Sequence, residues 1–99
     1  MVKFVDIADV TVDLETKDFH LVDVREVDEY AAGHVPGAVN LPLSELASRY
    51  TELDAGTAYH IICQKGGRSA QACAFLDSKG YDVTNISGGT AAWGGPLES

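Results

Sequence analysis

Cys63 opens a short turn in which one thiol, two glycines and two cationic side chains follow one another along the chain. The turn has the sequence Cys63-Gln64-Lys65-Gly66-Gly67-Arg68-Ser69. It follows an apolar run and precedes a helical pattern, so we expect the thiol at the end of a strand, facing free backbone N–H groups and a helix N-terminus. Negative charge is stabilised there, so Cys63 should ionise more readily than a free cysteine, and the thiolate is a nucleophile.

The residues after Cys63 form the predicted substrate-binding loop. Gly66 and Gly67 lack side chains, so the backbone can curl with its N–H groups aimed at a bound anion. Lys65 is expected to project into solvent and to raise the local positive potential. The predicted binding set comprises Gln64, Lys65, Gly66, Gly67, Arg68 and Ser69.

For four side chains, the sequence leaves a choice between two roles. Arg68 either contacts the anion or turns away and braces the loop against a carboxylate such as Asp23 or Glu29. The Ser69 hydroxyl either caps the following helix or donates a hydrogen bond to the sulfur. Asp23 and Arg25 lie at the carboxyl end of another predicted strand and share a face, so they could border the site. A structural ion pair, with Glu29 as a further member, is the simpler interpretation of these two.

Strand-like and helical patterns alternate along the chain. Residues 59–63 form a nearly continuous apolar run, typical of a parallel strand covered on both faces, and should be the central strand. Further strands are predicted at residues 4–5, 20–24 and 83–86, with a short extended piece within 35–40. Helices are predicted at residues 26–32, from a cap at Ser44, at 69–79 and at 90–93, with a short helix and loop over 6–17.

This alternation predicts an α/β fold of three layers, in which a mainly parallel central sheet has helices on both faces. Ligands bind such sheets at the carboxyl ends of strands, which is where Cys63 is expected. The sequence contains no internal repeat, low-complexity segment or linker. Residues 1–99 are therefore predicted to form a single domain.

The composition is that of an acidic globular domain, with 45% hydrophobic and 22% charged residues. The 15 Asp and Glu residues against 7 Lys and Arg give a net charge of −8, which argues against nucleic acid as a partner. Lys65 and Arg68 form a local cationic spot, which predicts a small anionic substrate. No segment is long and apolar enough to cross a bilayer, and the N-terminus reaches Asp6 before any signal-like stretch. We expect a cytoplasmic protein, and its two cysteines agree with a reducing compartment.

The second cysteine and the histidines are predicted to be structural. Cys73 lies on the inner face of the helix at 69–79, which indicates packing rather than a resolving thiol. The three histidines lack paired ligand spacing, so no metal is expected. His60 lies three positions before Cys63 on a strand, so the two face opposite sides and form no dyad. His34 lies in a Gly-His-Val-Pro-Gly turn, which it is expected to hold by hydrogen bonding.

Three ordered motifs resemble the single-domain rhodanese family of sulfurtransferases over about residues 21–93. The first motif is Leu21-Val22-Asp23-Val24-Arg25-Glu26 with Glu29-Tyr30, Gly33-His34-Val35-Pro36-Gly37-Ala38 and Asn40. The second is the Cys63 loop, and the third is Gly88-Gly89 with Trp93. Trp93 either packs in the core or forms one wall of the pocket. The resemblance implies the rhodanese-like three-layer fold and an enzyme that needs no metal or organic cofactor.

The resemblance also implies a reaction. Cys63 attacks the outer sulfur of thiosulfate or a persulfide, expels the leaving group and becomes a cysteine persulfide. A nucleophilic acceptor then takes the sulfur, which is cyanide in an assay and a thiol or a protein in the cell. Two alternatives stay open. One is a sulfur-carrier or docking module that acts with a partner protein, and the other is a reductase for an oxyanion such as arsenate, in which Cys73 resolves the intermediate.

Loop length separates the chain from the phosphatases that use cysteine. Four residues lie between Cys63 and Arg68, one fewer than in those enzymes, and Ile62 precedes Cys63 where they usually have His. A tetrahedral phosphate needs more room around the thiolate than a single transferred sulfur atom. Negligible phosphatase activity is therefore predicted.

Overall fold

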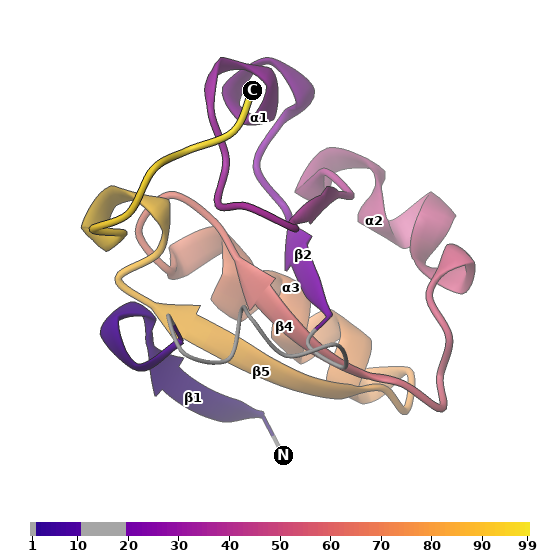
Figure 1. Cartoon of the computed structure of the whole chain (residues 1–99). Coiled ribbons are helices and arrows are strands. Elements are labelled where there is room, and N and C mark those ends of the chain that lie inside the picture. The colour runs from indigo at the N-terminus through magenta and orange to yellow at the C-terminus, as the bar shows by residue number, and fades with distance from the viewer. Residues whose placement is uncertain (1, 11–19) are drawn as a thin grey trace.

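The computed structural model of the chain describes residues 2–10 and 20–99, which contain a parallel β-sheet flanked by helices (Figure 1). The sheet has the strand order β1-β5-β4-β2-β3, and every neighbouring pair is parallel. The strands are β1 (Lys3–Asp6), β2 (Leu21–Asp23), β3 (Val39–Asn40), β4 (Ala58–Ile62) and β5 (Asp82–Ser87). The helices are α1 (Val27–Ala32), α2 (Leu43–Arg49) and α3 (Gly67–Ser78). Shorter 3₁₀ turns comprise Ile7–Asp9, Tyr50–Glu52 and Thr90–Ala92.

Strand β4 lies in the middle of the sheet, between β5 and β2. Its residue Ile61 pairs with Val22 of β2 and with Asn85 of β5. Ile61 and Ile62 are both fully buried, so the strand is covered on its two faces, as predicted for residues 59–63. Because all the strands are parallel, their carboxyl ends share one edge of the sheet, and Cys63 follows β4 at that edge.

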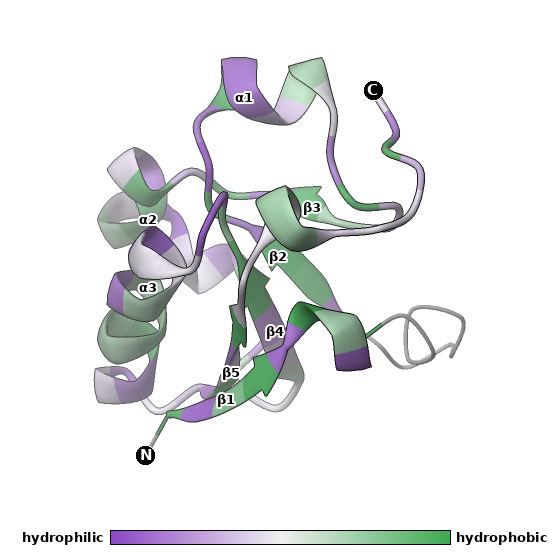
Figure 2. Ribbon diagram, turned by 90° about the vertical axis from the view of Figure 1, so that its left-hand side faces the viewer, coloured by the Kyte–Doolittle hydropathy of each residue, from purple (hydrophilic) through white to green (hydrophobic). Residues whose placement is uncertain are grey.

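The two faces of the sheet carry separate hydrophobic clusters, because successive strand residues point to opposite sides. Val22 belongs to the cluster beneath α2 and α3, with Leu46 and Leu76 from those helices, and Figure 2 shows both helices on one side of the sheet. The opposite cluster contains Ile7, Val10, Leu21, Val35, Ala38, Ile62 and Ile86, with Tyr30 of α1 and Trp93 packed against it. The predicted α/β architecture is confirmed, with the longer helices on one face and shorter elements on the other.

The starts of α1 and α2 differ in how they are capped. Helix α1 begins with a capping box, in which the Glu26 side chain accepts from the backbone of Glu29 and the Glu29 side chain accepts from the Glu26 amide. Helix α2 begins at Leu43, with Pro42 at the cap position and no side-chain cap. The predicted cap at Ser44 is wrong, because this residue lies inside the first turn and its hydroxyl donates to Glu26 at 2.6 Å.

Short segments near the chain ends complete the fold. The predicted helical segment at 90–93 is the 3₁₀ turn Thr90–Ala92, and the predicted helix within 6–17 begins as the turn Ile7–Asp9, while residues 11–17 lie outside the described residues. Near the C-terminus, the backbones of His34 and Glu98 exchange two hydrogen bonds of 2.8 Å each. In the described ranges, no helix has both the length and the apolar character needed to cross a membrane.

Candidate active site

The loop after β4 wraps around the sulfur of Cys63 before α3 begins at Gly67. The Gly66 amide donates to Sγ at 3.0 Å, and the Ser69 hydroxyl oxygen lies 3.3 Å from the same atom. Gly66 has φ +116°, a left-handed backbone conformation that residues with a Cβ rarely adopt. Glycine at this position therefore allows the chain to turn back so that its amide reaches the sulfur.

The surroundings of Cys63 favour its thiolate. Burial raises the pKa of the thiol, whereas hydrogen bonds from the Ser69 hydroxyl and from the amides of Ser69, Gly66 and Lys65 lower it. The lowering effects together outweigh burial, so the pKa of Cys63 lies below its ordinary value. The N-terminus of α3 begins beside the same sulfur and adds its positive end. The amides among these donors belong to the predicted binding loop, residues 64–69.

Cys63 is largely covered but reaches a pocket. Its exposed fraction is 1%, and it lines a pocket of about 370 Å³ together with Gln64, Lys65, Gly67 and Arg68. The thiol is thus part of the pocket wall while the rest of its surface is packed.

Arg68 turns toward α1 and forms a two-point ion pair with Glu29. The Nη1–Oε1 distance is 2.5 Å and the Nη2–Oε2 distance is 2.9 Å. The hydrogen bond from Arg68, followed by one from the Glu26 backbone, lowers the pKa of Glu29 from 4.5 to about 2. Arg68 therefore braces the loop, and its charge is matched by a carboxylate. The anionic substrate was predicted from two cations, Lys65 and Arg68. Of these, only Lys65 is exposed and without an acidic partner in the described part of the chain.

Asp23 and Arg25 form a buried ion pair beneath the loop. Their exposed fractions are 0% and 4%, and Arg25 Nη2 lies 3.0 Å from Asp23 Oδ2. The same guanidinium donates to the Gly33 carbonyl at 2.7 Å and to Gln64 Oε1 at 3.3 Å. The pair is thus structural. Arg25 also holds the side chain of Gln64, which follows the candidate nucleophile Cys63. The hydrogen-bonded partner of Glu29 is not this pair but Arg68.

Two amides from the segment after β5 also hold the loop, and the sequence analysis missed them. The Thr90 amide donates to the Cys63 carbonyl at 2.9 Å, and the Ala91 amide donates to the Gln64 carbonyl at 2.9 Å. Gly89 permits this close approach, since a Cβ there would lie 2.6 Å from the Gln64 carbonyl oxygen. In the sequence, the adjacent glycines Gly88 and Gly89 could have indicated a close backbone contact here.

Cys73, His34 and Trp93 have structural surroundings. Cys73 is fully buried, and burial raises its pKa to about 12. His34 Nδ1 lies 3.0 Å from the Tyr30 carbonyl, and the two rings stack with centroids 3.7 Å apart. Trp93 packs against the second hydrophobic cluster and donates from Nε1 to the Pro96 carbonyl at 3.0 Å. The predicted packing of Cys73 and the turn-holding role of His34 are confirmed, and of the two roles left open for Trp93 the structure shows packing.

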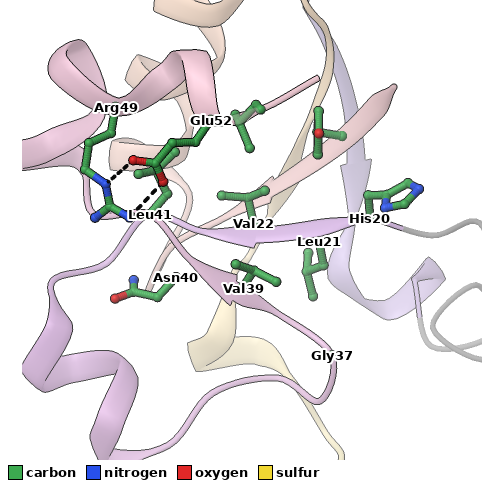
Figure 3. A pocket seen from close by; sticks show the side chains of 11 residues that line it. His20, Leu21, Val22, Gly37, Val39, Asn40, Leu41, Arg49 and Glu52 are labelled. Atoms are coloured by element: carbon green, nitrogen blue, oxygen red, sulfur yellow. Dashed lines mark hydrogen bonds and ion pairs between the residues drawn. The ribbon is translucent and has the colours of Figure 1, made fainter. Parts of the chain in front are cut away.

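A second pocket lies over β2 and β3 and shares no residue with the Cys63 loop (Figure 3). It has a volume of about 310 Å³, and its two charged side chains, Arg49 and Glu52, pair with each other at 2.9 Å. It is lined by His20, Leu21, Val22, Gly37, Val39, Asn40, Leu41, Arg49, Glu52, Leu53 and Tyr59. This wall has no thiol, so the candidate chemistry lies in the Cys63 pocket. Within residues 2–10 and 20–99, no group of three His, Cys, Asp or Glu side chains could hold a metal ion.

Known proteins are similar to the chain in sequence and in structure. The family model named Rhodanese-like domain matches residues 6–95. A "Sulfurtransferase" of Allochromatium vinosum is 41% identical over 80 residues, which cover 80% of this chain and 75% of that protein. The "Putative sulfur carrier protein YrkF" of Bacillus subtilis is 36% identical over 83% of this chain, which spans 45% of that longer protein. The crystal structure of a rhodanese-like domain protein from Staphylococcus aureus has a TM-score of 0.90 and 33% identity, covering 97% of this chain and 96% of that one.

Proposed function

The chain belongs to the rhodanese-like domain family, and we propose that it is a sulfurtransferase that carries the transferred sulfur on Cys63. A relative named sulfurtransferase supports this kind of enzyme. The observation that carries the proposal is the convergence of the Gly66 amide and the Ser69 hydroxyl on Sγ, at the wall of a pocket. Preorganised donors of this kind stabilise a sulfur anion without reorganising during the reaction.

In the first step, the Cys63 thiolate attacks the outer sulfur of thiosulfate or of a persulfide. The new S–S bond forms as the old one breaks, and the electron pair leaves with sulfite or with the thiolate of the donor. Cys63 becomes a persulfide, whose terminal sulfur can accept hydrogen bonds from the same loop. Each well-aimed donor in such a site contributes on the order of 3 kcal/mol to lowering the barrier.

In the second step, an acceptor attacks the terminal sulfur of the Cys63 persulfide and restores the thiolate. Cyanide gives thiocyanate in an assay, and a thiol or a protein thiolate is the proposed acceptor in the cell. No metal or organic cofactor is needed, because the sulfur itself is the group transferred. A reducing, cytoplasmic compartment suits this cycle, since Cys63 and Cys73 are both free thiols.

Steady-state kinetics of thiocyanate formation test the proposal. With sulfur donor and cyanide varied together, covalent catalysis through one thiol gives parallel double-reciprocal plots. Cys63→Ser should abolish turnover, whereas Cys73→Ala should retain it. Intersecting plots, or turnover that survives in Cys63→Ser, would overturn the proposal.

A second candidate is a sulfur carrier that exchanges its persulfide with a partner protein. The relative named as a sulfur carrier and the net charge of −8 favour it, because an acidic surface suits a basic partner. Fast persulfide transfer from a cysteine desulfurase, combined with slow turnover of small donors, would identify the carrier. Efficient turnover of thiosulfate would argue against it. The reductase alternative is disfavoured, because a resolving Cys73 thiol with a pKa of about 12 stays protonated near neutral pH.

A further inference from the structure

The three cations nearest the loop differ in how far their charge is available to a substrate. Arg68 makes its two-point pair with Glu29, and both side chains are about one-third exposed, at 35% and 34%. Arg25 is buried against Asp23. Lys65 is exposed and has no ion pair among the described residues. Each guanidinium is thus matched by one carboxylate.

This matching leaves Lys65 as the one unpaired cation among the described residues that line the pocket. The donors that converge on Sγ are amides and one hydroxyl, which carry partial charges only. The whole chain carries a net charge of −8, so the long-range potential is also negative. A thiosulfate dianion that approaches the thiolate therefore meets repulsion that the loop compensates only in part.

A persulfide makes a smaller electrostatic demand on the same site. Thiosulfate carries two negative charges beside the sulfur that is attacked, whereas a persulfide carries at most one on its reacting sulfurs. The transfer is Cys63–S⁻ + R–S–SH → Cys63–S–SH + R–S⁻, in which one S–S bond forms, one breaks and the negative charge passes to the leaving thiolate. No additional oxidant or reductant is required.

We propose that Glu29 is a specificity-determining residue, which neutralises Arg68 and so makes a persulfide of a thiol, rather than thiosulfate, the preferred sulfur donor. This inference rests on the proposed function of Cys63. The low pKa of Glu29 supports it, because the carboxylate stays ionised, and Arg68 stays matched, throughout the neutral range. Glu29 acts through Arg68 and does not touch the reacting sulfur in this role.

Glu29→Gln tests the inference with little disturbance of the fold. Gln at this position keeps the capping-box hydrogen bond to the Glu26 amide and removes only the charge. Glu52→Gln is the matched control, because Glu52 makes a similar two-point pair with Arg49 away from the Cys63 loop. Both variants change the net charge by the same amount, so a local effect is separated from a global one.

The measured quantity is kcat/KM for thiosulfate and for the persulfide of 2-mercaptoethanol, an uncharged thiol. In the wild-type protein, the persulfide should be preferred by about tenfold or more. Glu29→Gln should shift that ratio toward thiosulfate by about tenfold, whereas Glu52→Gln should leave it unchanged. In the wild-type protein, added salt should speed the thiosulfate reaction and have little effect on the persulfide reaction, because salt screens repulsion between like charges.

Three results separate the outcomes. A wild-type protein that uses thiosulfate as well as the persulfide overturns the inference. So does a ratio that Glu29→Gln shifts no more than Glu52→Gln, since the charge effect would then not be local. If neither donor places a sulfur on Cys63, the proposed function itself fails, and the inference falls with it.

Discussion

The amide nitrogen of Gly66 lies 3.0 Å from the sulfur of Cys63, three residues earlier in the chain. This contact depends on the φ of +116° at Gly66, so Gly66→Ala should destabilise the protein by about 1–2 kcal/mol. Gly67→Ala is the control, because a Cβ there meets nothing within 4 Å and the residue is helical, so its stability should be equal or slightly higher. Urea unfolding of the two variants measures the difference. Equal losses in both would contradict the role given to the backbone of Gly66.

The Ser69 hydroxyl sets part of the acidity of Cys63. Its single proton can go either to the Gly66 carbonyl, at 3.1 Å, or to Sγ, at 3.3 Å, and ionisation of the thiol favours the sulfur. Ser69→Ala should therefore raise the pKa of Cys63, because the thiolate loses a hydrogen bond that favours it. At any pH below that pKa, the thiolate fraction and the alkylation rate should fall.

The rate of iodoacetamide alkylation against pH measures this shift. Ser78→Ala is the control, because its hydroxyl bonds a carbonyl at the other end of α3, at 2.6 Å. Cys73 should not react in this range, since its pKa is about 12. An unchanged pH profile in Ser69→Ala would show that the hydroxyl serves the helix and not the sulfur.

The buried Asp23–Arg25 pair should be costly to break. Arg25→Ala leaves a fully buried carboxylate without its partner, and the expected loss of unfolding free energy is about 3–5 kcal/mol. Lys3→Ala removes an ion pair with Asp82 whose side chains are 61% and 55% exposed, and should cost less than about 1 kcal/mol. Urea unfolding compares the two. Similar costs would mean that the buried pair is not needed for stability.

The Glu29–Arg68 pair predicts a specific acid dependence. The folded pKa of Glu29 is lowered from 4.5 to about 2, so the pair's contribution is complete above pH 4.5 and is lost as the pH falls toward 2. Because both side chains are about one-third exposed, solvent screening limits the contribution to about 1 kcal/mol. The difference in unfolding free energy between the wild-type protein and Glu29→Gln should shrink over that pH range. A difference that stays constant down to pH 2 would contradict the assignment.

The position of the candidate nucleophile could be predicted because it depends on local patterns. The continuous apolar run at 59–63 indicates a strand buried on both faces, and such a strand belongs in the middle of a parallel sheet. The two glycines after Cys63 indicate a loop whose backbone turns back on the thiol. The buried face of α3, with Cys73 on it, follows from helical spacing in the same way.

The contacts that cross between elements could not be chosen from the sequence. Both Asp23 and Glu29 were available to Arg68, and the choice depends on where α1 lies relative to the loop. The hydrogen bond from Arg25 to Gln64 joins residues 39 positions apart, and no periodicity encodes it. The predicted cap at Ser44 is wrong because α2 starts two residues earlier than such a cap implies, which places the hydroxyl beside Glu26 instead of at the helix end.

Intact-mass measurement of the protein after exposure to sulfur donors tests the central claim most directly. Wild-type protein treated with thiosulfate or a persulfide should gain the mass of one sulfur atom, and cyanide should remove it. Cys73→Ala should behave in the same way, whereas Cys63→Ser should gain nothing. A wild-type protein that stays unmodified with every donor, or a sulfur that still adds to Cys63→Ser, would contradict the account.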